Sequence, residues 1–176
     1  MPNLYKDVVA ANELYAQTYT AQPDAFAHRH AAILTCMDSR LLPNEFMGFK
    51  AGDIHLIRNA GGRASDDAIR SLIISSKLLK TNQFFVVHHT DCGMQRFTNE
   101  SVQEVLASAL ASSVTYQPID WLTIQHGLFK SVLEDVTKIR NHPLISSDIP
   151  IYGFIFDVMT GKLIPVDEAI RVGKAK

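Results

Sequence analysis

The sequence predicts an α/β fold in which helices flank a mostly parallel, Rossmann-like β-sheet of four parallel strands plus an edge hairpin. Three features predict this class. Short, nearly continuous apolar runs recur along the 176 residues, amphipathic helical patterns separate them, and polar or glycine-rich clusters follow directly after the runs. Because functional groups in such folds gather at the carboxyl ends of the strands, these clusters contain the candidate functional residues.

The first part of the chain predicts a βαβ unit. Its helical segment begins after Ser65, which suits the N-cap, and Asp66 and Asp67 suit the positive end of the helix dipole. The apolar side chains of this segment share one face, as expected of a helix that packs on a sheet. The three strands of this part are predicted at residues 30–35, 54–57 and 83–87.

The second part predicts a long helix and a hairpin. Helical spacing of apolar residues runs from Trp121 to Ile139 and stops before Pro143, where proline disfavours continuation. A strand is then predicted at residues 151–158, and the chain turns and returns through residues 163–166. We expect this hairpin at an edge of the sheet.

Composition limits the partners and the location of the protein. With 17 basic and 18 acidic side chains, the chain has no broad charged field for nucleic acid or an anionic membrane, so a small molecule is the expected partner. The N-terminal segment lacks the apolar run of a signal peptide, and no apolar stretch is long enough to span a bilayer, which predicts a cytoplasmic protein. We expect one domain over residues 1–176, with a further helical segment at residues 102–110.

Cys36 and Cys92 are the only cysteines of the sequence, and each comes shortly after a predicted strand. In a reducing compartment, a structural disulfide between them is not expected. In a right-handed βαβ unit, the two strand ends can be neighbours, which would bring Cys36, His89 and Cys92 to a common point. Zinc prefers tetrahedral nitrogen and sulfur ligands, and three protein ligands leave the fourth position for water or substrate. On spacing alone, buried cysteines that only fill the core remain an equal alternative.

Asp38 and Arg40 lie two residues apart just beyond the first strand, and this spacing allows a charge-assisted, bidentate pair. The pair is either an ordinary loop salt bridge or, beside a metal, a functional group. In the second case Asp38 either accepts the proton of a metal-bound hydroxide or occupies the open coordination position itself. These two roles exclude each other.

Ala60, Gly61 and Gly62 follow the second predicted strand. Paired glycines allow close backbone approach and unusual dihedral angles, so we expect this loop to wall a small substrate pocket. The spaced glycines and the lysine of a phosphate-binding loop are missing, which disfavours a nucleotide-binding module.

Four motifs of this sequence resemble the β-class carbonic anhydrase family, whose pattern is C-x-D-x-R followed by H-x-x-C. They are CMDSR, RNAGG, DDAIRS and HHTDCGM. The resemblance runs from about Ala31 to Met94 and continues more loosely through residues 151–163. It implies a catalytic pair and a set of ligands for one zinc ion per subunit: Asp38 with Arg40, and Cys36 with His89 and Cys92.

The resemblance also implies the reaction. Zinc-bound hydroxide would attack carbon dioxide to give bicarbonate, and/or carbonyl sulfide to give carbon dioxide and hydrogen sulfide. Small-chain relatives leave open a dedicated carbonyl sulfide or carbon disulfide hydrolase with weak carbonic anhydrase activity. A non-catalytic zinc or redox-sensing protein is a second alternative. The larger anhydrases are expected to carry an asparagine or a similar residue where this chain has residues 60–62. The resemblance therefore does not imply that this chain has the same substrate pocket as they do.

Family members associate as dimers or larger assemblies, so the resemblance implies a homodimer or homotetramer with active sites near the interface. Residues 1 to about 28 would form a helical arm on a second subunit, and the alternative is that this segment packs on its own sheet.

His88 is expected to be an exposed histidine that passes the released proton to buffer.

Overall fold

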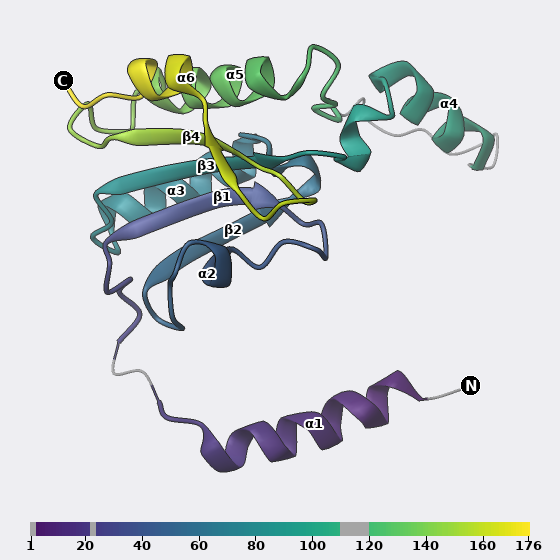
Figure 1. The fold of residues 1–176 in the computed structure, drawn as a ribbon, viewed down its shortest axis with the longest axis vertical. Helices are drawn as coiled ribbons and strands as arrows, with labels where there is room; N and C mark the ends of the chain where they lie inside the picture. Colours follow the sequence, from purple (N-terminus) through teal and green to yellow (C-terminus); the bar gives the residue numbers. More distant parts are fainter. Residues whose placement is uncertain (1–2, 22–23, 110–119) are drawn as a thin grey trace.

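Five strands form one sheet in the described part of the chain, which covers residues 3–21, 24–109 and 120–176 of the computed structural model (Figure 1). The strands are β1 Ala31–Cys36, β2 Ile54–Asn59, β3 Gln83–His89, β4 Ile151–Phe156 and β5 Leu163–Pro165. Their order across the sheet is β2-β1-β3-β4-β5. Strands β1 to β4 are parallel, and β5 pairs antiparallel with β4 at the edge. The predicted fold class and the edge hairpin are therefore confirmed.

The helices of the described residues are α1 Leu4–Thr18, α2 Pro43–Phe46, α3 Asp66–Lys77, α4 Asn99–Ala109, α5 Leu128–Arg140 and α6 Asp167–Val172. Helices α3, α5 and α6 pack on one face of this sheet, and Phe46 of α2 packs on the other. Two short 3₁₀ turns, Ala60–Gly62 and Gly93–Gln95, follow β2 and β3. The helix predicted at residues 102–110 corresponds to α4, and Leu110 lies outside the described residues.

Helix α3 begins as its sequence predicts. The Ser65 side chain accepts a hydrogen bond from the backbone N–H of Ala68 at 3.2 Å, and Asp66 and Asp67 lie in the first turn. Both features stabilise the positive end of the helix. Ile69 and Leu72 are buried on the face that packs against the sheet. The connecting helix of the βαβ unit is confirmed.

The predicted start of the long helix at Trp121 is wrong, because α5 begins only at Leu128. Leu122 and Gly127 have φ of 51° and 85°, in the left-handed region, and these conformations interrupt the right-handed helix. The predicted end is confirmed, since α5 stops at Arg140 with Asn141 as its C-cap.

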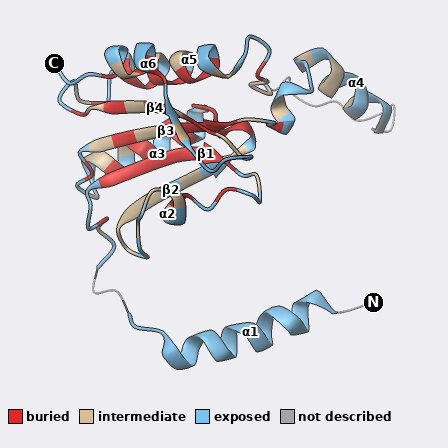
Figure 2. Cartoon of the chain, in the orientation of Figure 1, coloured by how far each residue is buried: buried red, intermediate tan, exposed pale blue. Residues whose placement is uncertain are grey.

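The buried residues are concentrated in the strands and in α5 (Figure 2), and they form two clusters on opposite faces of the sheet. On one face, Leu34 and Phe84 pack with buried residues of α3, α5 and α6. Gly153 permits close approach of α5 there, since a β-carbon at this position would lie 2.6 Å from Val132 Cγ1. On the other face, Ile33 and Val87 pack with the two cysteines, because successive side chains of a strand alternate between faces. The cysteines thus belong to the second cluster.

Helix α1 lies apart from the sheet (Figure 1). None of its residues is buried, so the alternative that it packs on its own sheet is wrong. Residues 1, 2, 22 and 23 of the proposed arm lie outside the described residues. Among the helices described, none has the length and apolar character to cross a membrane.

Candidate metal centre

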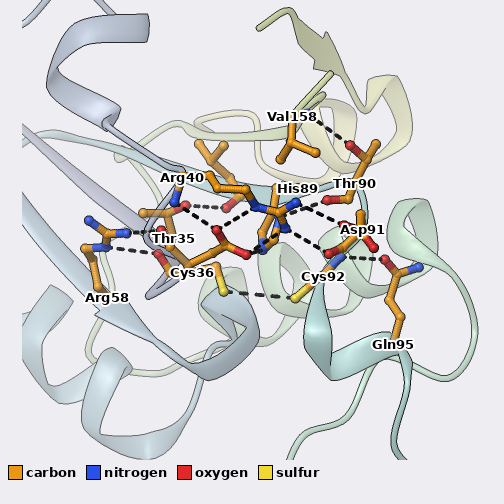
Figure 3. Close-up of polar contacts among 12 residues, drawn as sticks. Thr35, Cys36, Arg40, Arg58, His89, Thr90, Asp91, Cys92, Gln95 and Val158 are labelled. Carbon is orange, nitrogen blue, oxygen red and sulfur yellow. Dashed lines mark hydrogen bonds and ion pairs between the residues drawn. The ribbon is translucent and has the colours of Figure 1, made fainter. Parts of the chain in front are cut away.

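The ends of β1 and β3 bring three potential ligands together (Figure 3). Cys36 ends β1, His89 ends β3, and Cys92 follows in the next turn, and the two strands are paired neighbours. The Sγ atoms of the two cysteines are 4.0 Å apart, and the three ligand atoms lie within 4.8 Å of one another. All three residues are buried.

The imidazole of His89 presents its Nε2 nitrogen as a potential metal ligand. Its Nδ1 lies 2.9 Å from the carbonyl oxygen of Thr90, which only accepts, so Nδ1 carries the proton and Nε2 presents a lone pair. Nε2 is buried without a hydrogen-bond partner. A buried polar atom of this kind requires an explanation, and a metal ion beside the two sulfurs supplies one.

The spacing of the donor set fits zinc. Tetrahedral bonds of about 2.3 Å to two thiolates place the sulfurs roughly 3.8 Å apart. The separation of Cys36 and Cys92 Sγ, 4.0 Å, is close to this value. Two thiolates and one imidazole form the nitrogen and sulfur set that zinc prefers. Because zinc takes four ligands, these three residues would leave the fourth position open.

The two thiols differ in acidity. The pKa of Cys36 is lowered to about 4, because Cys92 donates a hydrogen bond to it and the backbone amides of Asp38 and Gly61 add to this effect against the cost of burial. The pKa of Cys92 is raised, because it is the donor in this pair and is itself buried. The pair therefore holds one proton, which a metal ion would displace on binding.

Asp38 and Arg40 form the predicted bidentate pair. Arg40 donates from Nε to Asp38 Oδ1 at 2.9 Å and from Nη2 to Oδ2 at 2.8 Å. The hydrogen bonds from the Arg40 side chain, and after them its backbone amide, hold the pKa of Asp38 well below its usual range despite partial burial. Asp38 Oδ2 lies 3.9 Å from His89 Nε2, so the carboxylate borders the ligand cluster.

Two charged residues of the site were missed by reasoning from sequence. Asp91 accepts from Arg40 Nη1 at 3.0 Å, and Arg58 donates to the carbonyl oxygens of Cys36 and Asp38 at 3.0 and 2.6 Å. The pKa of Asp91 is lowered by its hydrogen bond with Arg96 first and with Arg40 second. The position of Asp91 between His89 and Cys92 in the motif was the available signal.

The loop of residues 60–62 supports the metal ligands and borders a groove. Gly61 and Gly62 are buried, and the Gly61 amide is one of the groups that lower the pKa of Cys36. Ala60 is exposed and lines an apolar groove of about 330 Å³ together with Met94 and Trp121. The role of Ala60, Gly61 and Gly62 as the wall of a substrate pocket stays a prediction.

The expectation that His88 is exposed is wrong. Its side chain is fully buried, with Nε2 3.0 Å from Asp135 Oδ2 and Nδ1 2.6 Å from Ser131 Oγ. Asp135 also accepts from Arg63 Nε at 2.8 Å. Strand β3 continues through His89, and the alternation of side chains directs His88 toward α5, away from His89 and from solvent.

Comparison with known proteins places this geometry in a family. The profile of the family described as carbonic anhydrase matches residues 31–163. Beta-carbonic anhydrase 1 of Mycobacterium tuberculosis is 36% identical over 157 residues, covering 89% of this chain and 94% of the relative. Carbon disulfide hydrolase of Acidianus sp. is 36% identical over 156 residues, covering 77% of this chain and 76% of the relative. The crystal structure of a carbonic anhydrase from Streptococcus mutans superposes with a TM-score of 0.85 at 42% identity, covering 94% of this chain and 99% of that one.

Proposed function

Since the chain belongs to the β-carbonic anhydrase family, we propose that it is a zinc enzyme acting on carbon dioxide or on its sulfur analogues. Cys36, His89 and Cys92 would hold one zinc ion per subunit, and Asp38 and Arg40 would form the catalytic pair. The observation that carries the proposal is the unpartnered His89 Nε2, buried beside two sulfurs.

Zinc held by these three residues would lower the pKa of a bound water to about 7, far below that of free water, and so would supply a nucleophile near neutral pH. Asp38 is an acceptor only, because Arg40 keeps its pKa low. It therefore accepts a hydrogen bond from the attacking oxygen and directs a lone pair of that oxygen toward substrate. Arg40 holds the Asp38 carboxylate in this position through two hydrogen bonds.

The substrates are small, linear and uncharged. Carbon dioxide and water give bicarbonate and a proton, whereas carbonyl sulfide and water give carbon dioxide and hydrogen sulfide. Carbon disulfide requires two waters and releases carbon dioxide and two molecules of hydrogen sulfide. The anhydrase of M. tuberculosis and the carbon disulfide hydrolase of Acidianus sp. are both 36% identical to this chain, so identity does not rank the gases. A dedicated sulfur hydrolase with weak anhydrase activity is the alternative.

Parallel rate measurements test the proposal. We expect one zinc ion per chain by elemental analysis, and carbon dioxide hydration by stopped-flow pH indicator between pH 7 and 9. Carbonyl sulfide and carbon disulfide are assayed on the same sample by release of hydrogen sulfide. A zinc content far below one per chain contradicts the metal assignment. Full zinc with no turnover of any gas would favour the non-catalytic, redox-sensing alternative.

We also propose that the protein is a homodimer or homotetramer in the cytoplasm, with residues 1 to about 28 as an arm on a second subunit. One face of α1 carries Leu4, Val8 and Tyr15, which are 74%, 58% and 60% exposed to solvent in the single chain. An isolated helix of 15 residues is marginally stable in water, so this face requires a partner surface.

Light scattering after size exclusion tests this assembly. The full chain should elute as a dimer or tetramer, and replacing Leu4, Val8 and Tyr15 with serine should shift it toward monomer. Lys6→Ser, on the opposite side of the helix, is the control. A monomeric full chain would contradict the proposed arm.

A further inference from the structure

The guanidinium group of Arg40 bridges two loops of the candidate metal centre. One edge, Nε and Nη2, donates to the carboxylate of Asp38 after β1. The other edge donates to Asp91 after β3, from Nη1 to Oδ2 and from Nη2 to the carbonyl oxygen, both at 3.0 Å. Four hydrogen bonds along two edges determine the plane of the group as well as its position.

Asp91 has a backbone conformation suited to this contact. Its φ is 52°, in the left-handed region, where aspartate is among the better tolerated residues. Its carbonyl oxygen and its side chain both accept from Arg40 (Figure 3). The second carboxylate oxygen of Asp91 accepts from Arg96 Nη2 at 2.6 Å, which limits rotation of the carboxylate.

We propose that Asp91 is a positioning residue that fixes the guanidinium plane of Arg40 and, through it, keeps the carboxylate of Asp38 beside the metal position without ligating it. This inference rests on the proposed function of the same site. Asp38 Oδ2 is already 3.9 Å from His89 Nε2, so a small rotation would bring it among the ligands. Only the Arg40 side chain and backbone amide hold the carboxylate among the hydrogen bonds of the described residues.

An ordinary surface ion pair would not have this effect. Arg40 and Asp91 side chains are 44% and 53% exposed, so their charge attraction is screened and contributes little to folding. The contribution of Asp91 is instead geometric, because it occupies the edge of the guanidinium that Asp38 leaves free. Removing Asp91 should therefore change the orientation of Arg40 much more than the stability of the protein.

Two substitutions separate the side chain from the backbone. Asp91→Gly removes both carboxylate oxygens but retains the left-handed φ and the carbonyl acceptor. Asp91→Asn retains one neutral acceptor and also tolerates this φ. Asp67→Asn is the matched control, because it removes an aspartate from an exposed pair with Arg70 on α3, away from the site.

The first measurement is the NMR signal of the Arg40 guanidinium in ¹⁵N-labelled protein, recorded with and without zinc. We expect slow exchange of its N–H protons in wild type and in Asp67→Asn, intermediate exchange in Asp91→Asn, and fast exchange in Asp91→Gly. This measurement does not need a working enzyme. Equal exchange in wild type and Asp91→Gly would overturn the inference even where turnover is normal.

The second measurement is kcat/KM in the wild-type and Arg40→Ala backgrounds. Asp91→Gly should lower kcat/KM about 10-fold in wild type and have almost no further effect in Arg40→Ala. A crystal structure of zinc-loaded Asp91→Gly should place an Asp38 oxygen closer to the metal than in wild type. An equal loss in both backgrounds would mean that Asp91 acts independently of Arg40, which contradicts the inference. A wild-type protein without zinc or turnover would instead count against the proposed function.

Discussion

Gly62 lies directly against the backbone of Cys36. A β-carbon at Gly62 would be 2.8 Å from the Cys36 amide nitrogen and 2.8 Å from the carbonyl carbon of Thr35, and its φ is 68°. Both facts restrict this position to glycine, because the nearby atoms are backbone and cannot rotate away. The loop of residues 60–62 is thereby seated on the end of β1, where the Gly61 amide reaches the Cys36 thiolate.

Gly62→Ala should displace this loop from the metal centre. We expect a loss of about 2 to 4 kcal/mol in the free energy of unfolding, from the left-handed φ and the backbone clash together. Zinc affinity should also fall, because the Gly61 amide moves away from the Cys36 thiolate. Denaturant unfolding and competition with a zinc chelator measure the two effects.

Gly161→Ala is the control for this substitution. Gly161 has a similar φ of 71°, but a β-carbon there would have no neighbour within 4 Å. It should show the cost of the φ angle alone, about 1 kcal/mol, with unchanged zinc affinity. Equal effects of the two substitutions would mean that the contact with Cys36 is unimportant.

The parts of the fold that are encoded locally could be predicted from sequence. Apolar runs located the strands, and Ser65 with its two following aspartates located the start of α3. The start of α5 could not be located, because helical spacing of apolar residues continues through residues 121–127, whereas the left-handed φ values of Leu122 and Gly127 depend on tertiary packing. Amphipathic spacing does not report such backbone conformations.

In the site too, features encoded locally could be predicted from sequence, whereas contacts set by tertiary packing could not. Adjacent strand ends were enough to bring Cys36, His89 and Cys92 together, because parallel strands share one carboxyl edge. The partners of His88 are Asp135 and Ser131, which lie 47 and 43 residues away, and no local pattern connects them with His88. Side-chain alternation along β3 could have indicated burial of His88 only if the end of the strand had been placed correctly.

Cys92→Ser should remove tightly bound zinc. The serine hydroxyl is far less acidic than a thiol and is a poor zinc ligand at neutral pH, so a site with Cys36 and His89 alone should lose the metal. We expect much less than one zinc ion per chain after dialysis, measured by elemental analysis, and loss of hydration activity. A variant that retains stoichiometric zinc and full turnover would show that Cys92 is not a ligand.

Asp38→Ala should impair turnover while zinc remains bound. The attacking oxygen loses its acceptor, and Arg40 loses its bidentate partner. We expect kcat/KM for carbon dioxide to fall about 10- to 100-fold, with a zinc content equal to that of wild type. Rates that match wild type at every pH would refute the orienting role of Asp38.

Removal of zinc should expose an unusually acidic thiol. The pKa of Cys36 is lowered to about 4 by the hydrogen bond from Cys92 and by further donors, so its thiolate persists as the pH falls and is lost only near that value. An ordinary thiol is roughly 0.3% ionised at pH 6. Iodoacetamide at pH 6 should therefore alkylate Cys36 before Cys92 in the metal-free protein.

Mass spectrometry of the two cysteine peptides gives the readout, and zinc-loaded protein is the control. Zinc should protect both thiols. Preferential modification of Cys92, or no effect of zinc on either peptide, would contradict the assignment of Cys36 as the thiolate of the pair.

Asp135→Asn should destabilise the protein, because Asp135 is the buried anion between His88 and Arg63. Breaking a buried pair by removing one charge costs about 3 to 5 kcal/mol. Asp67→Asn, in an exposed pair, should change the free energy of unfolding by less than about 1 kcal/mol. Denaturant unfolding of both variants tests this difference, and similar small losses would show that the buried pair contributes no more than a surface one.

The effect of Asp135→Asn should also depend on pH in a defined direction. Burial raises the pKa of Asp135. The hydrogen bond with His88 and the interactions with His88 and Arg63 lower this pKa by a larger amount, so the folded-state pKa lies below the unfolded value of about 3.9. Between these two values the unfolded chain binds the extra proton, so stability rises with pH there. The contribution of the carboxylate is fully present above about pH 5 and is lost as the pH falls through the folded-state pKa. Unfolding curves between pH 7 and 3 should therefore show the gap between wild type and Asp135→Asn narrowing below about pH 4, whereas a constant gap would show that the pKa of Asp135 is the same in the folded and the unfolded protein.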